Sequence, residues 1–210
     1  MSQEEEKTKE RILKVARQNF IAKGLKGARM QEIADQAKVN KAMLHYYFQN
    51  KDNLYEQVLL NLHQQFATKI MGHQTSIPSV EGLITAIVNT MFAFHKEEPG
   101  FVKLLIWEAV GDAKILKKAL PGLMKMQHNQ GGQVFLVSQI QRLQEQGEMR
   151  KDLSAMQIAM NIAGLIIASL LQHLALPQIL GLPAEAQDKF LEERQAAVVK
   201  TLIDGLIIHR

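Results

Sequence analysis

Apolar residues recur at helical spacing along almost the whole chain. In the segment 7–23 they form a single stripe at offsets of one, three and four, consisting of Ile12, Leu13, Ala16, Phe20 and Ile21. This spacing is typical of an amphipathic helix. Alternation of apolar and polar residues, the signature of a strand, never persists. The pattern therefore predicts an all-α protein.

Glycine, proline and asparagine divide this pattern into segments. Gly24 is expected to end the first helix as a C-terminal cap, and Asn40 and Asn50 are placed to cap the helices that follow them. Loops are expected at 72–79 and 176–183, each of which contains proline. The predicted helices cover residues 7–23, 30–37, 41–48, 51–71, 80–95, 101–110, 122–146, 154–173 and 184–208.

The first three predicted helices are short and have the proportions of a helix-turn-helix. In the third, Leu44 and Phe48 are four residues apart and are expected to face the core. A small helix with one buried side and one polar side can enter the major groove of DNA, which is about 12 Å wide. The side chains left to face outward, wholly or in part, are Lys41, Ala42, Met43, His45, Tyr46 and Tyr47.

The charge distribution agrees with a DNA-binding N-terminal region. The net charge of the chain is +4, yet the segment 1–51 holds 11 Lys+Arg against 6 Asp+Glu, a balance of +5. The remainder holds 14 against 15, a balance of −1. Such asymmetry suggests that the N-terminal end meets a polyanion, although a solvated helix with spare lysines would give the same numbers.

Several classes of protein are disfavoured by what the sequence lacks. There is no cysteine, which excludes disulfides and a thiolate nucleophile or metal ligand. The seven histidines do not cluster at metal-binding spacing, and no Glu-x-x-His, P-loop or Gly-x-Ser-x-Gly motif occurs. We therefore expect no catalytic residues, no metal and no cofactor, so the protein is not expected to be an enzyme.

No membrane or export signal is expected. The segment 1–10 is polar and charged, with no apolar run behind it. The most apolar stretch, 159–176, is interrupted by Asn161, Gln172 and His173. A buried or interface helix is favoured over a membrane span, and the expected location is the cytoplasm.

The segment 33–54, which reads IADQAKVNKAMLHYYFQNKDNL, resembles the DNA-binding signature of the TetR (tetracycline repressor) family. Ile12, Phe20, Gly24 and Leu25 match the first helix of that signature, so the resemblance covers about residues 8–60. It implies a helix-turn-helix domain over 1–51 and a helical ligand-binding and dimerisation domain over 52–210. The function it implies is transcriptional regulation, most simply repression of a palindromic operator that is relieved by a small, largely apolar ligand.

The resemblance also implies roles for single residues. Lys41 and Ala42 stand where the family reads base edges, and exposed Met43 lies beside them. The positions where phosphate contacts are usual are occupied by Asn40, His45, Tyr46 and Lys51. Asn40, Ala42 and His45 replace the common Ser, Gly and Tyr. Ala28 and Arg29 replace the family's common Thr/Ser pair, whose hydroxyl caps the second helix and contacts phosphate. The charge of Arg29 can supply a phosphate contact instead.

For the second domain the resemblance implies a homodimer formed through the last two long helices. The residues agree, because the helix at 154–173 is apolar nearly all round and must be covered on every side. Both helices could instead fill the core of one chain.

The ligand pocket is expected among the helices between 80 and 146. Methionines, aromatics and one histidine are the candidates, although such residues at helical spacing are often plain core. They are Met91, Phe92, Trp107, Met124, His128 and Phe135. The alternative function is a helical protein that binds double-stranded DNA without small-molecule control.

Overall fold

The computed structural model describes residues 3–71, 79–111, 117 and 135–207. Predictions that fall elsewhere lie outside the described residues: the loop at 72–78, most of the helix expected over 122–146, and the ligand candidates Met124 and His128.

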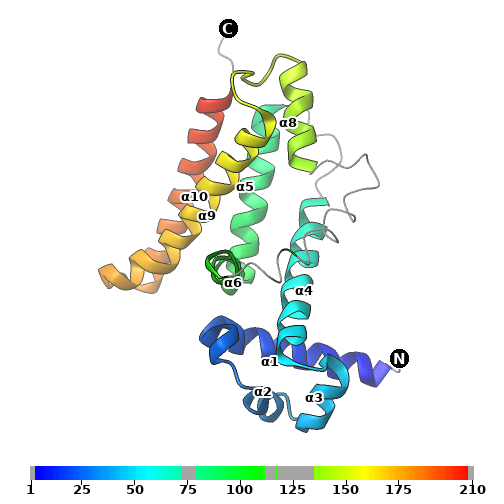
Figure 1. Cartoon of the computed structure of the whole chain (residues 1–210). Coiled ribbons are helices and arrows are strands. Elements are labelled where there is room, and N and C mark those ends of the chain that lie inside the picture. Colours follow the sequence, from blue (N-terminus) through cyan, green and yellow to red (C-terminus); the bar gives the residue numbers. More distant parts are fainter. Residues whose placement is uncertain (1–2, 72–78, 112–116, 118–134, 208–210) are drawn as a thin grey trace. The chain divides into compact units, whose positions relative to one another are not determined.

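The described residues form nine helices and one isolated β-bridge, between Met149 and Ile207. The prediction of an all-α fold is therefore confirmed. The N-terminal part begins with four helices, coloured blue to cyan in Figure 1: α1 (Gln3–Gly27), α2 (Met30–Gln36), α3 (Lys41–Phe48) and α4 (Lys51–Met71).

The ends of these helices follow the local signals in the sequence. Gly24 has a φ of 67° and breaks α1 where a stop was expected, after which one further turn follows. The side-chain oxygen of Asn40 accepts the backbone N–H of Met43 at 2.7 Å. The side-chain oxygen of Asn50 accepts the N–H of Asn53 at 2.8 Å. Both caps are confirmed, and each satisfies an amide that the first helical turn leaves without a partner.

The core of this part is a single apolar cluster. Its side chains come from α1 to α4 and are almost fully buried, and the rings of Phe20 and Tyr55 meet edge to face at 5.0 Å. Each such side chain contributes about 1.5–3 kcal/mol when it leaves water, so this cluster fixes the helices that carry the candidate site. Its main members are Ile12, Ala16, Phe20, Ile33, Leu44, Phe48, Leu54 and Tyr55.

The remaining helices are α5 (Val80–Glu97), α6 (Gly100–Val110), α8 (Phe135–Glu145), α9 (Ala155–Leu180) and α10 (Ala184–Leu206). Helices α5, α9 and α10 contact one another and lie side by side in Figure 1, and α8 packs against α9.

The expected end of α9 was wrong. A loop was predicted from residue 176, but the helix continues through Pro177 to Leu180. Proline lacks an N–H and removes only the bond to the carbonyl of His173. Pro177 is buried and its own carbonyl accepts the N–H groups of Gly181 and Leu182, where Gly181 supplies a left-handed cap with a φ of 63°.

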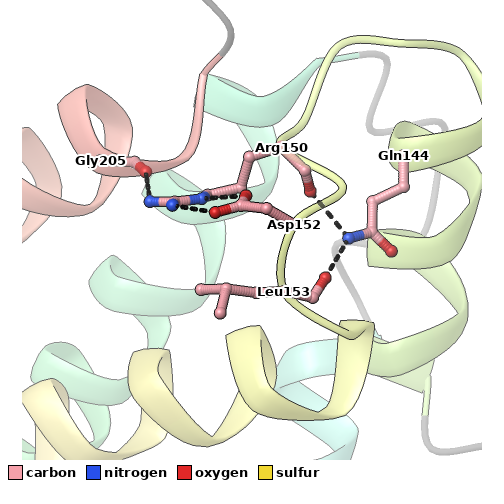
Figure 2. A network of polar contacts seen from close by, with 5 residues as sticks. All are labelled: Gln144, Arg150, Asp152, Leu153 and Gly205. Carbon is pink, nitrogen blue, oxygen red and sulfur yellow. Dashed lines mark hydrogen bonds and ion pairs between the residues drawn. The ribbon is translucent and has the colours of Figure 1, made fainter.

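A network of polar contacts joins the segment between α8 and α9 to the end of α10 (Figure 2). Gln144 donates its side-chain N–H groups to the carbonyls of Arg150 and Leu153, both at 2.8 Å. The Arg150 guanidinium donates to the Gly205 carbonyl at 3.1 Å and pairs with Asp152. Because the last carbonyls of a helix lack helical partners, this network caps α10.

The chain divides into two compact units. One contains Met1–Gln65 and Lys103–Pro121, and the other contains Phe66–Val102 and Gly122–Arg210. The division falls inside α4 and inside α6, so each of these helices contributes to both units. The assignment of residues 1–51 and 52–210 to separate domains stays a prediction.

Candidate nucleic-acid interface

Helix α3 presents a polar side to solvent because its apolar side is held in the core. Leu44 is fully buried and Phe48 is 1% exposed. The other side is open, and Tyr46 is 76% exposed although it is aromatic. An aromatic side chain that remains in water on a capped, anchored helix is available to a partner. The remaining exposed candidates on this helix are Lys41, Ala42, Met43 and His45.

A groove of about 810 Å³ runs between α3 and the start of α1. Four of the predicted DNA contacts line it together, namely Asn40, Ala42, Met43 and Tyr46. The other lining residues are Tyr47 and, from α1, Glu4, Glu5 and Thr8. The three α1 residues were not among the predicted site residues. Their spacing puts Glu4 and Thr8 on one helical face, but no local signal shows that this face borders α3.

Two of the candidates that line or cap α3 already make side-chain hydrogen bonds within the protein. His45 Nδ1 lies 2.7 Å from the carbonyl oxygen of Gln49. A carbonyl only accepts, so Nδ1 is the donor in this contact, and Nε2 remains open. The side-chain oxygen of Asn40 is used by its cap, which leaves its N–H groups for a phosphate.

Lys51 lies at the start of α4 and binds the end of α1. Its Nζ donates to the carbonyls of Ala28 at 3.2 Å and Lys26 at 3.4 Å. Arg29, directly after Ala28, is exposed and begins α2 without a side-chain cap, as the missing hydroxyl predicted. The structure therefore brings Arg29 and Lys51 to the same short segment.

Polar contacts also fix α1 against α2. Arg11 Nε donates to the Ala37 carbonyl at 2.9 Å, and the Asn19 amide, 5% exposed, donates to the Gln36 side chain at 2.8 Å. Lys23 forms a 2.6 Å ion pair with Glu32 and lowers the pKa of that carboxyl. Since α2 packs on α3, these contacts help to orient the exposed helix.

The described ligand candidates are divided between the two units. Met91 and Phe92 lie in the core of the second unit, 8% and 0% exposed. Trp107 belongs to the first unit, where its ring packs on Gly24. Phe135 opens α8, and its side chain lies outside what the structure describes.

A pair of histidines, one of them buried, was not predicted. His95 of α5 is 1% exposed, and its Nε2 lies 3.1 Å from Nδ1 of His173 in α9. Burial, and then the neighbouring His173, lower the pKa of His95 to about 4. Within the described residues, Nδ1 of His95 has no hydrogen-bond partner. Among the same residues, no group of three or more His, Asp or Glu could hold a metal ion.

Helix α9 carries an apolar surface that this chain leaves uncovered. Met156 and Met160, one turn apart, are 51% and 59% exposed, and Leu171 is 37% exposed. A Cβ placed on Gly164 would meet no atom within 4 Å. By length and composition α9 could cross a membrane, and 28% of its most apolar stretch is buried.

Two family models match the chain. "Bacterial regulatory proteins, tetR family" matches residues 12–58, and "Tetracyclin repressor-like, C-terminal domain" matches residues 81–202. The first match contains α2 and α3, and the second contains most of the helices that follow α4.

Individual proteins are similar to parts of the chain. The HTH-type transcriptional repressor SCO4008 of Streptomyces coelicolor is 30% identical over 105 residues, which are 50% of this chain and 51% of the relative. The HTH-type transcriptional repressor NicS of Pseudomonas putida is 28% identical over 107 residues, which are 51% of this chain and 50% of the relative. The chain thus spans about half the length of these curated relatives.

The whole fold has counterparts among solved structures. The transcriptional regulator FadR of Bacillus subtilis, solved in complex with stearoyl-CoA, superposes with a TM-score of 0.73 at 16% identity, covering 95% of this chain and 98% of that one. At such low identity the similarity shows the fold alone.

Proposed function

Because this chain belongs to the TetR family of bacterial regulatory proteins, we propose that it is a transcriptional repressor that binds a palindromic operator as a homodimer. A small, largely apolar ligand would release the repressor from the operator. The observation that carries the proposal is α3, a capped helix anchored by Leu44 and Phe48 that turns its polar side and Tyr46 toward solvent.

The exposed side of α3 offers the chemistry that duplex DNA requires. The Lys41 ammonium can donate to guanine O6 or N7, and the small Ala42 side chain allows close approach to a thymine methyl. Asn40 and Tyr46 can donate to phosphate oxygens, as can the ammonium of Lys51 and the guanidinium of Arg29. Met43 and His45 complete the surface, His45 through its remaining ring nitrogen.

The homodimer is proposed to form through α9 and α10. A helix that is apolar on nearly every side and mostly uncovered in one chain needs a further partner. Exposed Gly164 allows the close approach of a second helix. We propose that a second copy of the chain covers this face, because a two-fold dimer also explains binding to a palindromic operator. Two copies of α3 related by the two-fold axis would meet half-sites one helical turn, about 34–36 Å, apart. The polar Asn161 within this exposed face argues against a lipid partner.

The ligand is proposed to bind in the second unit. Met91 and Phe92 supply adaptable apolar surface there, and Met124, His128 and Phe135 remain candidates from the sequence. FadR, which shares the fold, was solved with stearoyl-CoA, and the acyl chain of that molecule is apolar, which supports a ligand of the same character here. A ligand that prefers one dimer geometry shifts the population away from the operator-binding geometry by the difference in its affinities.

Selection of bound duplexes from a random DNA pool tests the proposal directly. We expect a palindromic consensus with half-sites about one helical turn apart, as binding by a dimer requires. The proposed place of action is the cytoplasm of the host. Lys41→Ala is the test variant, and Lys151→Ala, at an exposed lysine between α8 and α9, is the matched control. The absence of any enriched duplex at low salt would contradict operator binding.

Ligand control is tested separately by thermal melting against a library of small apolar molecules. A ligand that binds only the folded protein raises the melting temperature, and the same compound should release the selected duplex. A compound that stabilises the protein and leaves the complex intact would contradict induction and support the alternative of DNA binding without small-molecule control.

A further inference from the structure

The last two turns of α6 pack on the unit that carries α3, far from it in sequence. Trp107 lies against Gly24, the residue at which α1 breaks. A Cβ built on Gly24 would lie 2.8 Å from Cζ3 and 3.1 Å from Cε3 of the indole ring. Gly24 is therefore required twice, by its positive φ and by the ring that occupies the place of a side chain.

The indole ring is held in position from its own helix. Lys103, one turn earlier in α6, places its Nζ 5.0 Å from the centre of the ring, within cation–π range. The next residue, Glu108, is 7% exposed. Burial, and then the nearby Glu108 carboxylate, raise the pKa of Tyr55 to about 12. Since Tyr55 packs on Phe20 of α1, this end of α6 is tied to both α1 and α4.

The segment beneath the ring leads directly to the DNA-reading helices. The Ala28 N–H donates to the Gly24 carbonyl at 3.1 Å, and Ala28 is 2% exposed. Lys51 holds the carbonyls of Lys26 and Ala28 from the start of α4. Residues 24–28 are thus fixed between Trp107 on one side and Lys51 on the other, and α2, which packs on α3, begins two residues later.

We propose that Trp107 is a positioning residue for DNA binding: by filling the notch at Gly24 it sets where α1 ends and thereby how α2 and α3 are presented to the operator. Trp107 touches no DNA in this arrangement. The inference rests on the proposed operator binding, and it assigns to the unit that binds DNA a side chain that the sequence pattern placed in the ligand pocket.

A double-mutant cycle on the full-length protein tests the contact. The variants are Gly24→Ala, Trp107→Leu and the double variant, and the probe is the duplex selected by the wild-type protein, compared with a scrambled duplex of equal length. Val110→Ala is the control for losing apolar volume on α6, because Val110 is 83% exposed. Affinity is measured by anisotropy of a labelled duplex at several salt concentrations, after chemical denaturation has shown that each variant is folded.

We expect each single variant to bind the operator more weakly. Gly24→Ala should cost less in the Trp107→Leu background, with a coupling of about fivefold in affinity. The slope of affinity against salt should stay that of the wild type, because no phosphate contact is removed. Additive effects, a changed slope, or an effect of Val110→Ala equal to that of Trp107→Leu would overturn the proposal.

One further measurement keeps the inference testable if Gly24→Ala does not fold, and a second checks the contact if it does. Trp107→Leu leaves Gly24 intact, and wild-type affinity in that variant would by itself overturn the proposal. Trp107 is also the only tryptophan in the chain, so acrylamide quenching of fluorescence reports on the notch. We expect greater quenching in a folded Gly24→Ala protein, and unchanged protection would refute the contact. Failure of the wild-type protein to bind any duplex would count instead against the proposed function.

Discussion

The buried His95 makes the stability of the fold depend on pH in a defined window. His95 is 1% exposed, and its pKa falls from 6.5 to about 4, first because of burial and then because of His173. Above pH 6.5 both the folded and the unfolded chain hold a neutral imidazole. Between pH 6.5 and about 4 the unfolded chain gains a proton that the folded chain resists. Acidification through this window therefore destabilises the fold.

The magnitude follows from the size of the pKa shift. Each pKa unit corresponds to about 1.4 kcal/mol, so the lowering of His95 represents about 3 kcal/mol lost by pH 4. Other groups near the pair also titrate or carry charge. Burial also lowers the pKa of His173, an effect that Asp188 opposes and Lys96 reinforces. Glu192 pairs with Lys96. A variant that changes His95 alone separates its contribution from theirs.

The assay is chemical denaturation of wild type and His95→Gln at fixed protein concentration between pH 7.5 and 4. Glutamine keeps a hydrogen-bonding group for His173 and cannot titrate. We expect the wild-type free energy of unfolding to fall by about 3 kcal/mol more than that of the variant across the window. Parallel curves for the two proteins would refute the assignment of a buried, neutral His95.

Four further single substitutions give testable predictions. Gln144→Ala removes two hydrogen bonds to carbonyls and should cost about 1–2 kcal/mol in chemical denaturation, whereas exposed Gln146→Ala should cost little. Asn40→Ala removes the cap of α3 and should lower stability by about 1 kcal/mol and weaken binding to every duplex, measured by denaturation and anisotropy. Lys41→Ala should weaken operator binding by about 1–3 kcal/mol and relax base preference. Lys51→Met should weaken binding to all duplexes and lower the slope of affinity against salt by about one, because a phosphate contact is lost. It should also reduce the melting temperature, because the Lys51 ammonium holds the end of α1.

Local chemistry explains which parts of the fold could be predicted from the sequence. Asn40 and Asn50 cap their helices because a side-chain oxygen reaches an amide three residues ahead, a contact that needs no tertiary context. Gly24 breaks α1 because it adopts a positive φ readily. Pro177 misled the same reasoning, since its burial and the cap at Gly181 keep α9 helical beyond it.

Contacts between distant segments could not be predicted in this way. His95 and His173 are 78 positions apart, and neither lies in a pattern that points to the other. Trp107 has the size and polarity of a pocket residue, and its sequence neighbours give no sign that α6 packs on Gly24. The groove beside α3 likewise combines α1 and α3 residues that only the tertiary fold brings together. Helical periodicity identifies a buried face, but it does not identify what covers that face.

The uncovered face of α9 links folding to assembly. Exposed Met156, Met160 and Leu171 would leave water when a second copy covers them, and each fully buried side chain of this kind contributes about 1.5–3 kcal/mol. The melting temperature of the proposed dimer must therefore rise with protein concentration. Met160→Glu would bury a charge in that interface and should remove the dependence on concentration, while Glu145→Gln on α8, outside the proposed interface, serves as an exposed control. A wild-type melting temperature that is constant over a hundredfold dilution would show that α9 is not covered by a second copy.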